Sequence, residues 1–264
     1  MNNMIELSDV SYSYEGTPAL KNITLRIEKG ESVALMGMNG SGKSTLLKLI
    51  NGILFPDSGT YRFAGEKITH KKMQDPLFSK RFHQKIGFVF QNADTQLFCA
   101  DVYDEIAFGP RQMGLDEDET EKRVEDCLSL LSIEALRHRQ PYHLSGGEKR
   151  KVAIASVLSL NPEVLVFDEP LLGLDPRTQR WFVSFLMKLH EAGKTLLVST
   201  HNLEMVQEMA ERAVLFDESH TIAADRPAGE LLKDVDLLIR TNLVDEYYHH
   251  HPGAGHQHFH IHPF

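Results

Sequence analysis

The sequence predicts an α/β fold with a mostly parallel central sheet that is covered by helices on both faces. A glycine-rich loop joins one apolar strand to a helix, and further apolar strands alternate with segments of helical periodicity. The predicted core strands lie at 32–36, 86–90, 164–167 and 195–200. Strands that alternate with helices form parallel sheets, because each crossover helix returns the chain to the end of the sheet where the previous strand began.

The composition is that of a soluble globular protein with one large or two small domains. The 264 residues include 42% hydrophobic and 25% charged residues, and no apolar run approaches the roughly 18–20 residues of a membrane span. The first residues do not resemble a signal peptide, and only Cys99 and Cys127 occur, so we expect a reducing cytosol. The net charge of −9 argues against nucleic acid as a partner, because nucleic-acid-binding proteins present basic surfaces.

The segments around the glycine-rich loop predict several short strands. Residues 4–28 alternate loosely between apolar and polar types, with a turn at 16–18. The helix after the loop ends near 51–52, and a further strand is expected at 60–64. Residues 66–84 are polar and basic, so we expect them to lie on the surface.

Residues from about 92 to 142 predict a helical subdomain inserted into the α/β core. An acidic run at 116–121 opens a helix whose apolar positions follow an i, i+3, i+4, i+7 pattern from Val124 to Leu131. Acidic side chains at a helix start interact favourably with the positive end of the helix, so this run has a structural explanation.

The remaining elements complete the α/β pattern. Asp175 and Pro176 are favourable residues for the start of the helix after strand 164–167. After His201, which follows strand 195–200, the pattern predicts a helix over 202–211, strands near 213–217 and 220–224, and a short helix near 227–233.

The glycine-rich loop fits the phosphate-binding pattern Gly-x-x-x-x-Gly-Lys-Ser and lies between the strand and the helix that this pattern requires. Glycines let the backbone approach the phosphates, and the N–H groups at the helix start bind anions. Lys43 is expected to reach the β- and γ-phosphates, and Ser44 to ligate Mg²⁺. The residues that we expect to bind a nucleoside triphosphate are Gly37, Asn39, Gly40, Ser41, Gly42, Lys43, Ser44 and Thr45.

Two further motifs carry chemistry. Asp168 and Glu169 end an apolar strand, where the first can hold Mg²⁺ and the second can act as a general base toward water. The segment 144–148 places two glycines after a serine at a second helix start, which is another anion-binding arrangement. One nucleotide does not need two such sites so far apart in sequence, so each can cover the nucleotide of a second copy of the chain. An ordinary capped helix start is the alternative.

Together these motifs resemble those of the ATP-binding subunits of ABC transporters over about residues 3–235. The family signature is matched by Leu144, Ser145, Gly146, Gly147 and Glu148. Its Gln-loop, D-loop and switch histidine match Gln91, Asp175 and His201, and its adenine-stacking aromatic residue matches Tyr14 better than Tyr12. Leu171 and Leu172 depart from the small or polar residues that the family has before its D-loop.

The resemblance implies an ABC-type nucleotide-binding domain over residues 1–235. This domain has a P-loop, RecA-like core, an antiparallel β subdomain and an inserted helical subdomain over about 92–160. ATP and Mg²⁺ are the implied cofactors, with the metal held by Ser44, Gln91 and Asp168, and Glu169, His201 and Gln91 are the implied catalytic residues. The implied partner is a second copy or a paralogous ABC ATPase, bound head-to-tail so that the signature of one chain grips the γ-phosphate of the other.

Within the family, residues 91–98 and 104–110 resemble the ATPases of energy-coupling-factor importers of the cobalt and nickel type. This implies an ATPase on the cytoplasmic face of the plasma membrane, bound there through an integral membrane transporter subunit that docks near the Gln-loop. Leu97, Phe98 and Phe108 can line that docking groove or pack the helical subdomain. The alternative functions are a soluble ABC ATPase, for example in iron–sulfur cluster assembly, and an importer ATPase for another substrate such as a vitamin.

Residues 236–264 are expected to form a C-terminal extension whose last part, 249–264, is rich in histidine. Alternate histidines project to one side of an extended chain, and neutral imidazoles bind Ni²⁺, Co²⁺, Zn²⁺ and Cu²⁺. We expect this tail to contact Ni²⁺ or Co²⁺, whereas a cloning tag and a plain polar extension are the alternatives. The candidate ligands are His249, His250, His251, His256, His258, His260 and His262.

Overall fold

A six-stranded sheet forms the centre of the computed structural model, which describes residues 3–244. Its strand order is β10-β9-β3-β8-β7-β6, and every neighbouring pair is parallel except β9 and β10. All residues of β3, β7 and β8 are buried, as expected for strands with helices on both faces. The strands are β3 (Ser32–Met36), β6 (Ile86–Val89), β7 (Val164–Asp168), β8 (Thr195–Ser199), β9 (Arg212–Phe216) and β10 (Ile222–Pro227).

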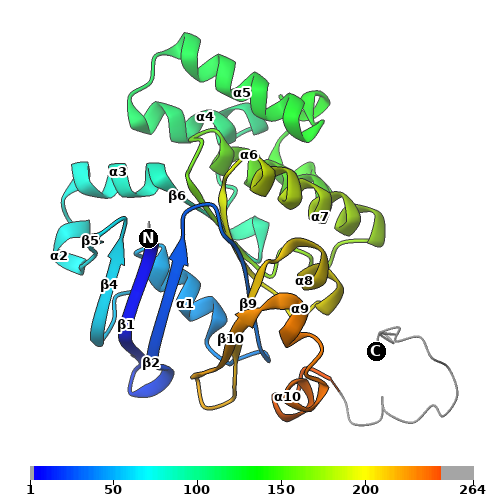
Figure 1. The fold of residues 1–264 in the computed structure, drawn as a ribbon. Helices are drawn as coiled ribbons and strands as arrows, with labels where there is room; N and C mark the ends of the chain where they lie inside the picture. Colours follow the sequence, from blue (N-terminus) through cyan, green and yellow to red (C-terminus); the bar gives the residue numbers. More distant parts are fainter. Residues whose placement is uncertain (1–2, 245–264) are drawn as a thin grey trace, which may run out of the picture.

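A smaller antiparallel sheet lies beside the central one, with the strand order β2-β1-β4-β5. Helix α1 (Lys43–Ile50) lies between the two sheets, and its leucines share one apolar cluster with residues from both (Figure 1). This arrangement brings the start of α1 to the junction of the sheets. The strands are β1 (Asn3–Tyr14), β2 (Thr17–Glu28), β4 (Ser58–Phe63) and β5 (Glu66–Lys67).

Most of residues 66–84 are exposed, in agreement with the prediction that they lie on the surface, but the segment also contributes to the core. It forms β5, α2 (His70–Met73) and most of α3 (Pro76–Lys85). Phe78 and Phe82 are buried in the core of the antiparallel sheet, where the Phe82 ring lies 5.2 Å from that of Phe63. Two apolar residues four positions apart make a short inward face that the many surrounding lysines and polar residues hide in the sequence.

The predicted helical subdomain consists mainly of α4 (Val102–Met113), α5 (Glu117–Leu131) and α6 (Gly146–Leu158). Helices α4 and α5 stand together at one end of the molecule, away from the antiparallel sheet (Figure 1). The predicted apolar face of α5, from Val124 to Leu131, is buried. Short 3-10 turns connect these elements: η1 (Ala93–Thr95), η2 (Glu134–Leu136) and η3 (Pro141–His143).

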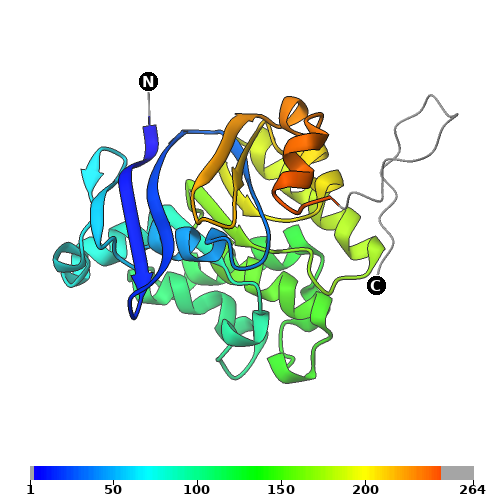
Figure 2. The same ribbon diagram turned by 90° about the horizontal axis from the view of Figure 1, so that it is seen from below.

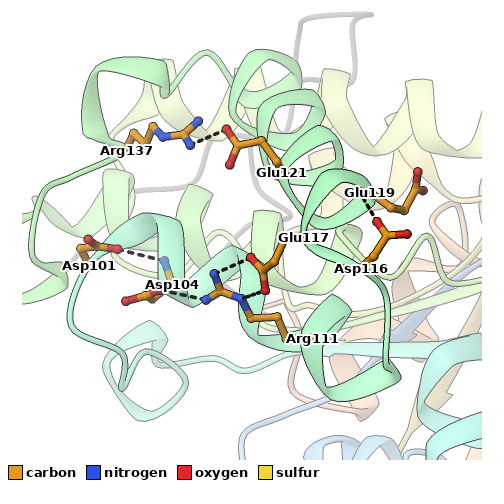
Figure 3. Close-up of polar contacts among 8 residues, drawn as sticks. All are labelled: Asp101, Asp104, Arg111, Asp116, Glu117, Glu119, Glu121 and Arg137. Atoms are coloured by element: carbon orange, nitrogen blue, oxygen red, sulfur yellow. Dashed lines mark hydrogen bonds and ion pairs between the residues drawn. The ribbon is translucent and has the colours of Figure 1, made fainter.

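The acidic run at the start of α5 caps the helix and forms ion pairs (Figure 3). The Asp116 carboxylate accepts a hydrogen bond from the Glu119 N–H. Arg111 of α4 pairs with Glu117 at 3.0 Å, and Arg137 pairs with Glu121. These contacts account for the acidic run in structural terms, as its position in the sequence suggests.

The remaining helices cover the central sheet. Helix α7 (Pro176–Glu191) buries Phe182, Phe185, Leu186 and Leu189, and α8 (Leu203–Met209) lies within the predicted range of 202–211. Helices α9 (Ala228–Leu231) and α10 (Val235–Arg240) lie on the side away from the antiparallel sheet (Figure 2). Leu238 of α10 is fully buried, so packing against the core continues past the domain boundary predicted at residue 235. Among residues 3–244, no helix is long and apolar enough to cross a bilayer.

Candidate active site

The phosphate-loop backbone is wedged between the two sheets. Gly37 and Gly42 have φ values of 144° and 110°. A Cβ atom on Gly42 would lie 2.4 Å from the Ala19 carbonyl oxygen, and one on Gly37 would lie 2.8 Å from the Phe216 carbonyl oxygen. Only glycine fits these two positions, because any side chain would collide with the backbone of β2 or β9.

The loop has free capacity to bind an anion. Gly42 precedes the first turn of α1, and no side chain in the described part of the chain caps that turn, so its N–H groups are open to a ligand. The Ser41 hydroxyl is buried and finds no hydrogen-bond partner within residues 3–244. An unpaired buried hydroxyl beside open backbone donors fits a bound phosphate, which would satisfy all of them. Asn39 and Gly40 are exposed, whereas Thr45 is buried.

Lys43 is held over this loop. Lys43 is 5% exposed, and its Nζ donates hydrogen bonds to the carbonyl oxygens of Gly37 at 2.7 Å and Met38 at 2.9 Å. Nζ also lies 3.8 Å from Oε1 of Glu169. Burial lowers the pKa of Lys43, and the nearby carboxylates of Glu169 and Asp168 oppose that shift. The cation is therefore positioned beside both the phosphate loop and the end of β7.

The two predicted metal ligands Ser44 and Asp168 are in contact. The Ser44 hydroxyl donates to Oδ1 of Asp168 at 2.9 Å, and the Ser199 hydroxyl donates to the same oxygen at 2.6 Å. Ser199 also accepts a hydrogen bond from the Glu169 N–H at 2.8 Å. Ser199 was not predicted, although a serine near the end of a strand adjacent to β7 is a signal that the sequence offers.

Glu169 and His201 form a pair at the ends of β7 and β8. Nδ1 of His201 lies 3.0 Å from Oε2 of Glu169, and this hydrogen bond raises the pKa of His201. Glu169 is 6% exposed, and its Oε1 accepts no hydrogen bond from the part of the chain that the structure describes. Its φ of 42° is unusual for a residue with a side chain, and such strain concentrates at functional positions.

Gln91 is exposed just beyond β6, and no hydrogen bond within residues 3–244 joins its side chain to Ser44 or Asp168. Its own carbonyl oxygen accepts a hydrogen bond from Arg150. The structure therefore links five of the predicted side chains by hydrogen bonds or ion pairs, directly or through Ser199, and within residues 3–244 the Gln91 side chain is not among them. The five are Lys43, Ser44, Asp168, Glu169 and His201.

The signature segment begins α6 with a complete capping box. Ser145 precedes the helix, its N–H and hydroxyl both donate to the Glu148 carboxylate, and its hydroxyl accepts from the Glu148 N–H. These bonds lower the pKa of Glu148. Leu144 is buried, but Ser145 and Gly146 are exposed, and Gly147 is half-buried. No hydrogen bond or ion pair in the described range joins this segment to residues 37–45.

The remaining predicted residues lie away from the phosphate loop or outside the described residues. Tyr14 is 43% exposed near the end of β1, with its ring edge-on to Tyr12, which packs partly into the core. Asp175 caps α7 by accepting from the N–H groups of Arg177 and Thr178. The predicted metal-binding histidines at 249–262 lie outside the described residues.

The apolar residues beside the Gln-loop divide into two groups. Leu97 packs partly against the core of the helical subdomain. Phe98 is 68% exposed and Phe108 is 42% exposed, and their rings meet edge-to-face at 5.0 Å between centroids. Leu97 therefore packs the helical subdomain, which is one of the two predicted roles. Phe98 and Phe108 form an aromatic pair on the surface instead.

Comparisons with known proteins agree with this geometry. The sequence profile described as ABC transporter matches residues 20–172. The nickel import ATP-binding protein LarO of Lactiplantibacillus plantarum is 46% identical over 86% of this chain and 95% of its own. The energy-coupling factor transporter ATP-binding protein EcfA of Methanothermobacter thermautotrophicus is 45% identical over 91% of this chain and 76% of its own.

A solved structure also agrees. That of cbiO1 from Clostridium perfringens, part of the ABC transporter complex cbiONQ, superposes with a TM-score of 0.79 at 34% identity, covering 92% of this chain and 96% of its own. These matches confirm the predicted fold class and the resemblance to ATPases of the energy-coupling-factor type. This chain therefore belongs to the ABC transporter family, as one of its ATP-hydrolysing chains.

Proposed function

We propose that this chain hydrolyses ATP to energise a membrane importer of a transition-metal cation, nickel or cobalt. The observation that carries the ATPase part is the convergence of Lys43, Asp168 and Glu169 at the carboxyl ends of β3 and β7, where α/β sheets bind their ligands. The nickel import relative LarO, at 46% identity, supports the choice of substrate class.

At the phosphate loop, Lys43 and the open N–H groups of α1 would hold the β- and γ-phosphates. Ser44 and Asp168, which already share a hydrogen bond of 2.9 Å, would hold Mg²⁺, and the bound metal would neutralise phosphate charge. Glu169 would polarise the attacking water, with His201 fixing its carboxylate and contacting the γ-phosphate. Gln91 would reach the metal and the water after movement of its loop, and Tyr14 would stack on the adenine.

We further propose that two chains close head-to-tail, as a homodimer or with a paralogous ABC ATPase. Ser145 and Gly146 are exposed at a helix start, and a hydroxyl and N–H groups placed there can grip an anion from another molecule. In this arrangement the segment 144–148 of one chain completes the site at residues 37–45 of the other. In the capping box the Ser145 hydroxyl donates its single proton to the Glu148 carboxylate, so it would exchange that hydrogen bond for one to the anion when the second chain closes.

The surface pair Phe98 and Phe108 is the proposed docking site for an integral membrane subunit. Exposed aromatic side chains of this size are enriched where proteins meet their partners. Docking there would place the chain on the cytoplasmic face of the plasma membrane as a peripheral subunit. In the same proposal, residues 1–235 form the ATPase domain together with α10, which packs against it, and the histidines at 249–262 contact the imported Ni²⁺ or Co²⁺.

Metal uptake by cells that lack this chain tests the function. We expect uptake of radioactive Ni²⁺ or Co²⁺ to be lost, to return with the wild-type chain and with Lys48→Ala, and to stay absent with Lys43→Ala. Lys48 is a matched control, because it lies on α1 but outside the phosphate loop. Loss of vitamin uptake with normal metal uptake would identify another importer. Normal uptake of both, with no membrane protein co-purifying, would favour a soluble ATPase.

A further inference from the structure

Arg150 of α6 is a buried cation that forms no ion pair within residues 3–244, although the Asp168 carboxylate favours its charged form. The residue is 5% exposed, and burial lowers its pKa. Its guanidinium donates from Nη1 to the Phe90 carbonyl oxygen at 2.6 Å and from Nη2 to the Gln91 carbonyl oxygen at 2.5 Å. A buried charge is costly unless it is well hydrogen-bonded, so these two bonds are what hold the guanidinium in place.

Two more contacts attach the same loop segment to α6. The Gln96 side chain accepts from the Phe90 N–H at 3.1 Å and donates to the Ala153 carbonyl oxygen at 3.0 Å. Lys149 pairs with Asp94 at 2.6 Å. Residues 90–96 are therefore joined to one helix at positions 149, 150 and 153, although β6 is their neighbour in sequence.

A buried carboxylate fixes the far end of this segment. Glu105 of α4 is 3% exposed, and its Oε2 accepts from the N–H groups of Phe98 at 2.9 Å and Cys99 at 2.7 Å. The Gln-loop and the exposed Phe98 that follows it are thus held at both ends by helices of the helical subdomain.

The helix that holds Gln91 is the one that begins with the signature. Arg150 follows Ser145 by five residues, which is about 7.5 Å along a helix axis. Over so short a distance a hydrogen-bonded helix moves as a rigid unit. A shift of Ser145 toward a nucleotide would therefore carry the main chain of Gln91 with it.

We propose that Arg150 is a positioning residue for ATP hydrolysis, which fixes the Gln91 main chain to the signature helix so that both move together. Arg150 touches neither nucleotide nor water in this proposal. It acts through Gln91, so the inference rests on the proposed role of Gln91 in the site.

Arg150→Lys tests this role, because lysine keeps the charge but cannot donate to two carbonyl groups in the fixed geometry of a guanidinium. We expect kcat for ATP hydrolysis to fall about ten- to a hundredfold, since misplacing a reacting group by about 1 Å has effects of that size. KM and the Kd for MgATP should stay within about twofold, because the phosphate loop is untouched.

The matched control is Arg137→Lys, since Arg137 also ties parts of the helical subdomain together but contacts Glu121 rather than the Gln-loop (Figure 3). Its kcat should stay within about twofold of wild type. Equal losses of kcat and thermal stability in the two variants would make Arg150 a merely structural residue and overturn the proposal. If Arg150→Lys does not fold, Arg150→Met, which removes the buried charge together with both hydrogen bonds, gives the same test, and a normal kcat in that variant overturns the proposal.

A double-mutant comparison separates this inference from the function on which it rests. Gln91→Ala alone should lower kcat, and adding Arg150→Lys should lower it no further, because both act through one group. Independent, multiplying effects would show that Arg150 acts elsewhere and overturn the inference. A normal kcat in Gln91→Ala would refute the role of Gln91 and the inference with it. A low kcat in Gln91→Ala with a normal kcat in Arg150→Lys would refute only the inference.

Discussion

Glu169 combines burial, backbone strain and two oxygens in different surroundings. One oxygen pairs with His201 at 3.0 Å, and the other lies 3.8 Å from Nζ of Lys43 and accepts no hydrogen bond from residues 3–244. The N–H of Glu169 donates to Ser199, which also holds Asp168. A single serine hydroxyl thus links the proposed metal ligand to the proposed base, and the carboxylate of Glu169 keeps one oxygen available for a water molecule.

Glu169→Gln should leave ATP binding intact and slow hydrolysis about a hundredfold or more, which is the usual contribution of a positioned general base. Glutamine has nearly the same shape but cannot take up a proton from water at neutral pH. Equilibrium binding of a fluorescent ATP analogue and steady-state phosphate release would measure the two effects. Turnover close to that of wild type would refute the assignment of Glu169 as the base.

At the scale of single elements, α3 shows how much packing a short and polar helix can provide. Its sequence is basic, yet Phe78 and Phe82 are buried against the antiparallel sheet. Asp75 and Pro76 start the helix, with the Asp75 carboxylate accepting from the Leu77 N–H at 2.9 Å. The favourable helix start and two inward phenylalanines are enough to fix the segment.

Phe82→Ala should reduce the free energy of unfolding by about 3 kcal/mol or more, the usual effect of removing a buried phenylalanine. Leu77→Ala on the same helix is the control, because Leu77 is 72% exposed and its truncation should change stability by about 0.5 kcal/mol or less. Urea denaturation of both variants measures the difference. Similar stability of the two would mean that α3 does not pack as described.

Sequence patterns predict the elements that are long or strictly periodic. The buried strands β3, β7 and β8 and the apolar face of α5 follow directly from their patterns. Helix α3 was missed because its apolar face has only two residues, which is too few to outweigh its charged composition. Arg150 was missed for a related reason, because it lies in a run of three basic residues, 149–151, and such runs are usually exposed to solvent. Only tertiary contacts show that its middle member is buried.

At the scale of the whole molecule, the groups of the candidate site gather around the phosphate loop, and the signature segment lies apart from them. The phosphate loop and the ends of β7 and β8 supply cations, hydroxyls and carboxylates, whereas the signature segment makes no polar contact with that loop in the described range. Ser145 and Gly146 of this segment are exposed. A second chain in head-to-tail orientation would bring each exposed helix start to a phosphate loop.

ATP should therefore drive dimerisation of the Glu169→Gln variant, which binds ATP without consuming it. Adding Ser145→Arg should abolish the ATP-dependent dimer while leaving ATP affinity of the single chain unchanged within about twofold, because a large cation blocks the helix start. Ser129→Arg is the control at an exposed position of α5, and it should dimerise normally. Analytical ultracentrifugation measures the state, and a dimer that survives Ser145→Arg would contradict the head-to-tail arrangement.

The contact between Gly42 and the Ala19 carbonyl oxygen limits how this protein can evolve. A Cβ atom at residue 42 would lie 2.4 Å from that oxygen and would push β2 away from the start of α1. Every single-base change that puts another amino acid in place of glycine adds a Cβ atom. Substitutions of Gly42 are therefore not tolerated unless β2 shifts first. Descendants of this gene are expected to keep glycine there even if their substrate changes.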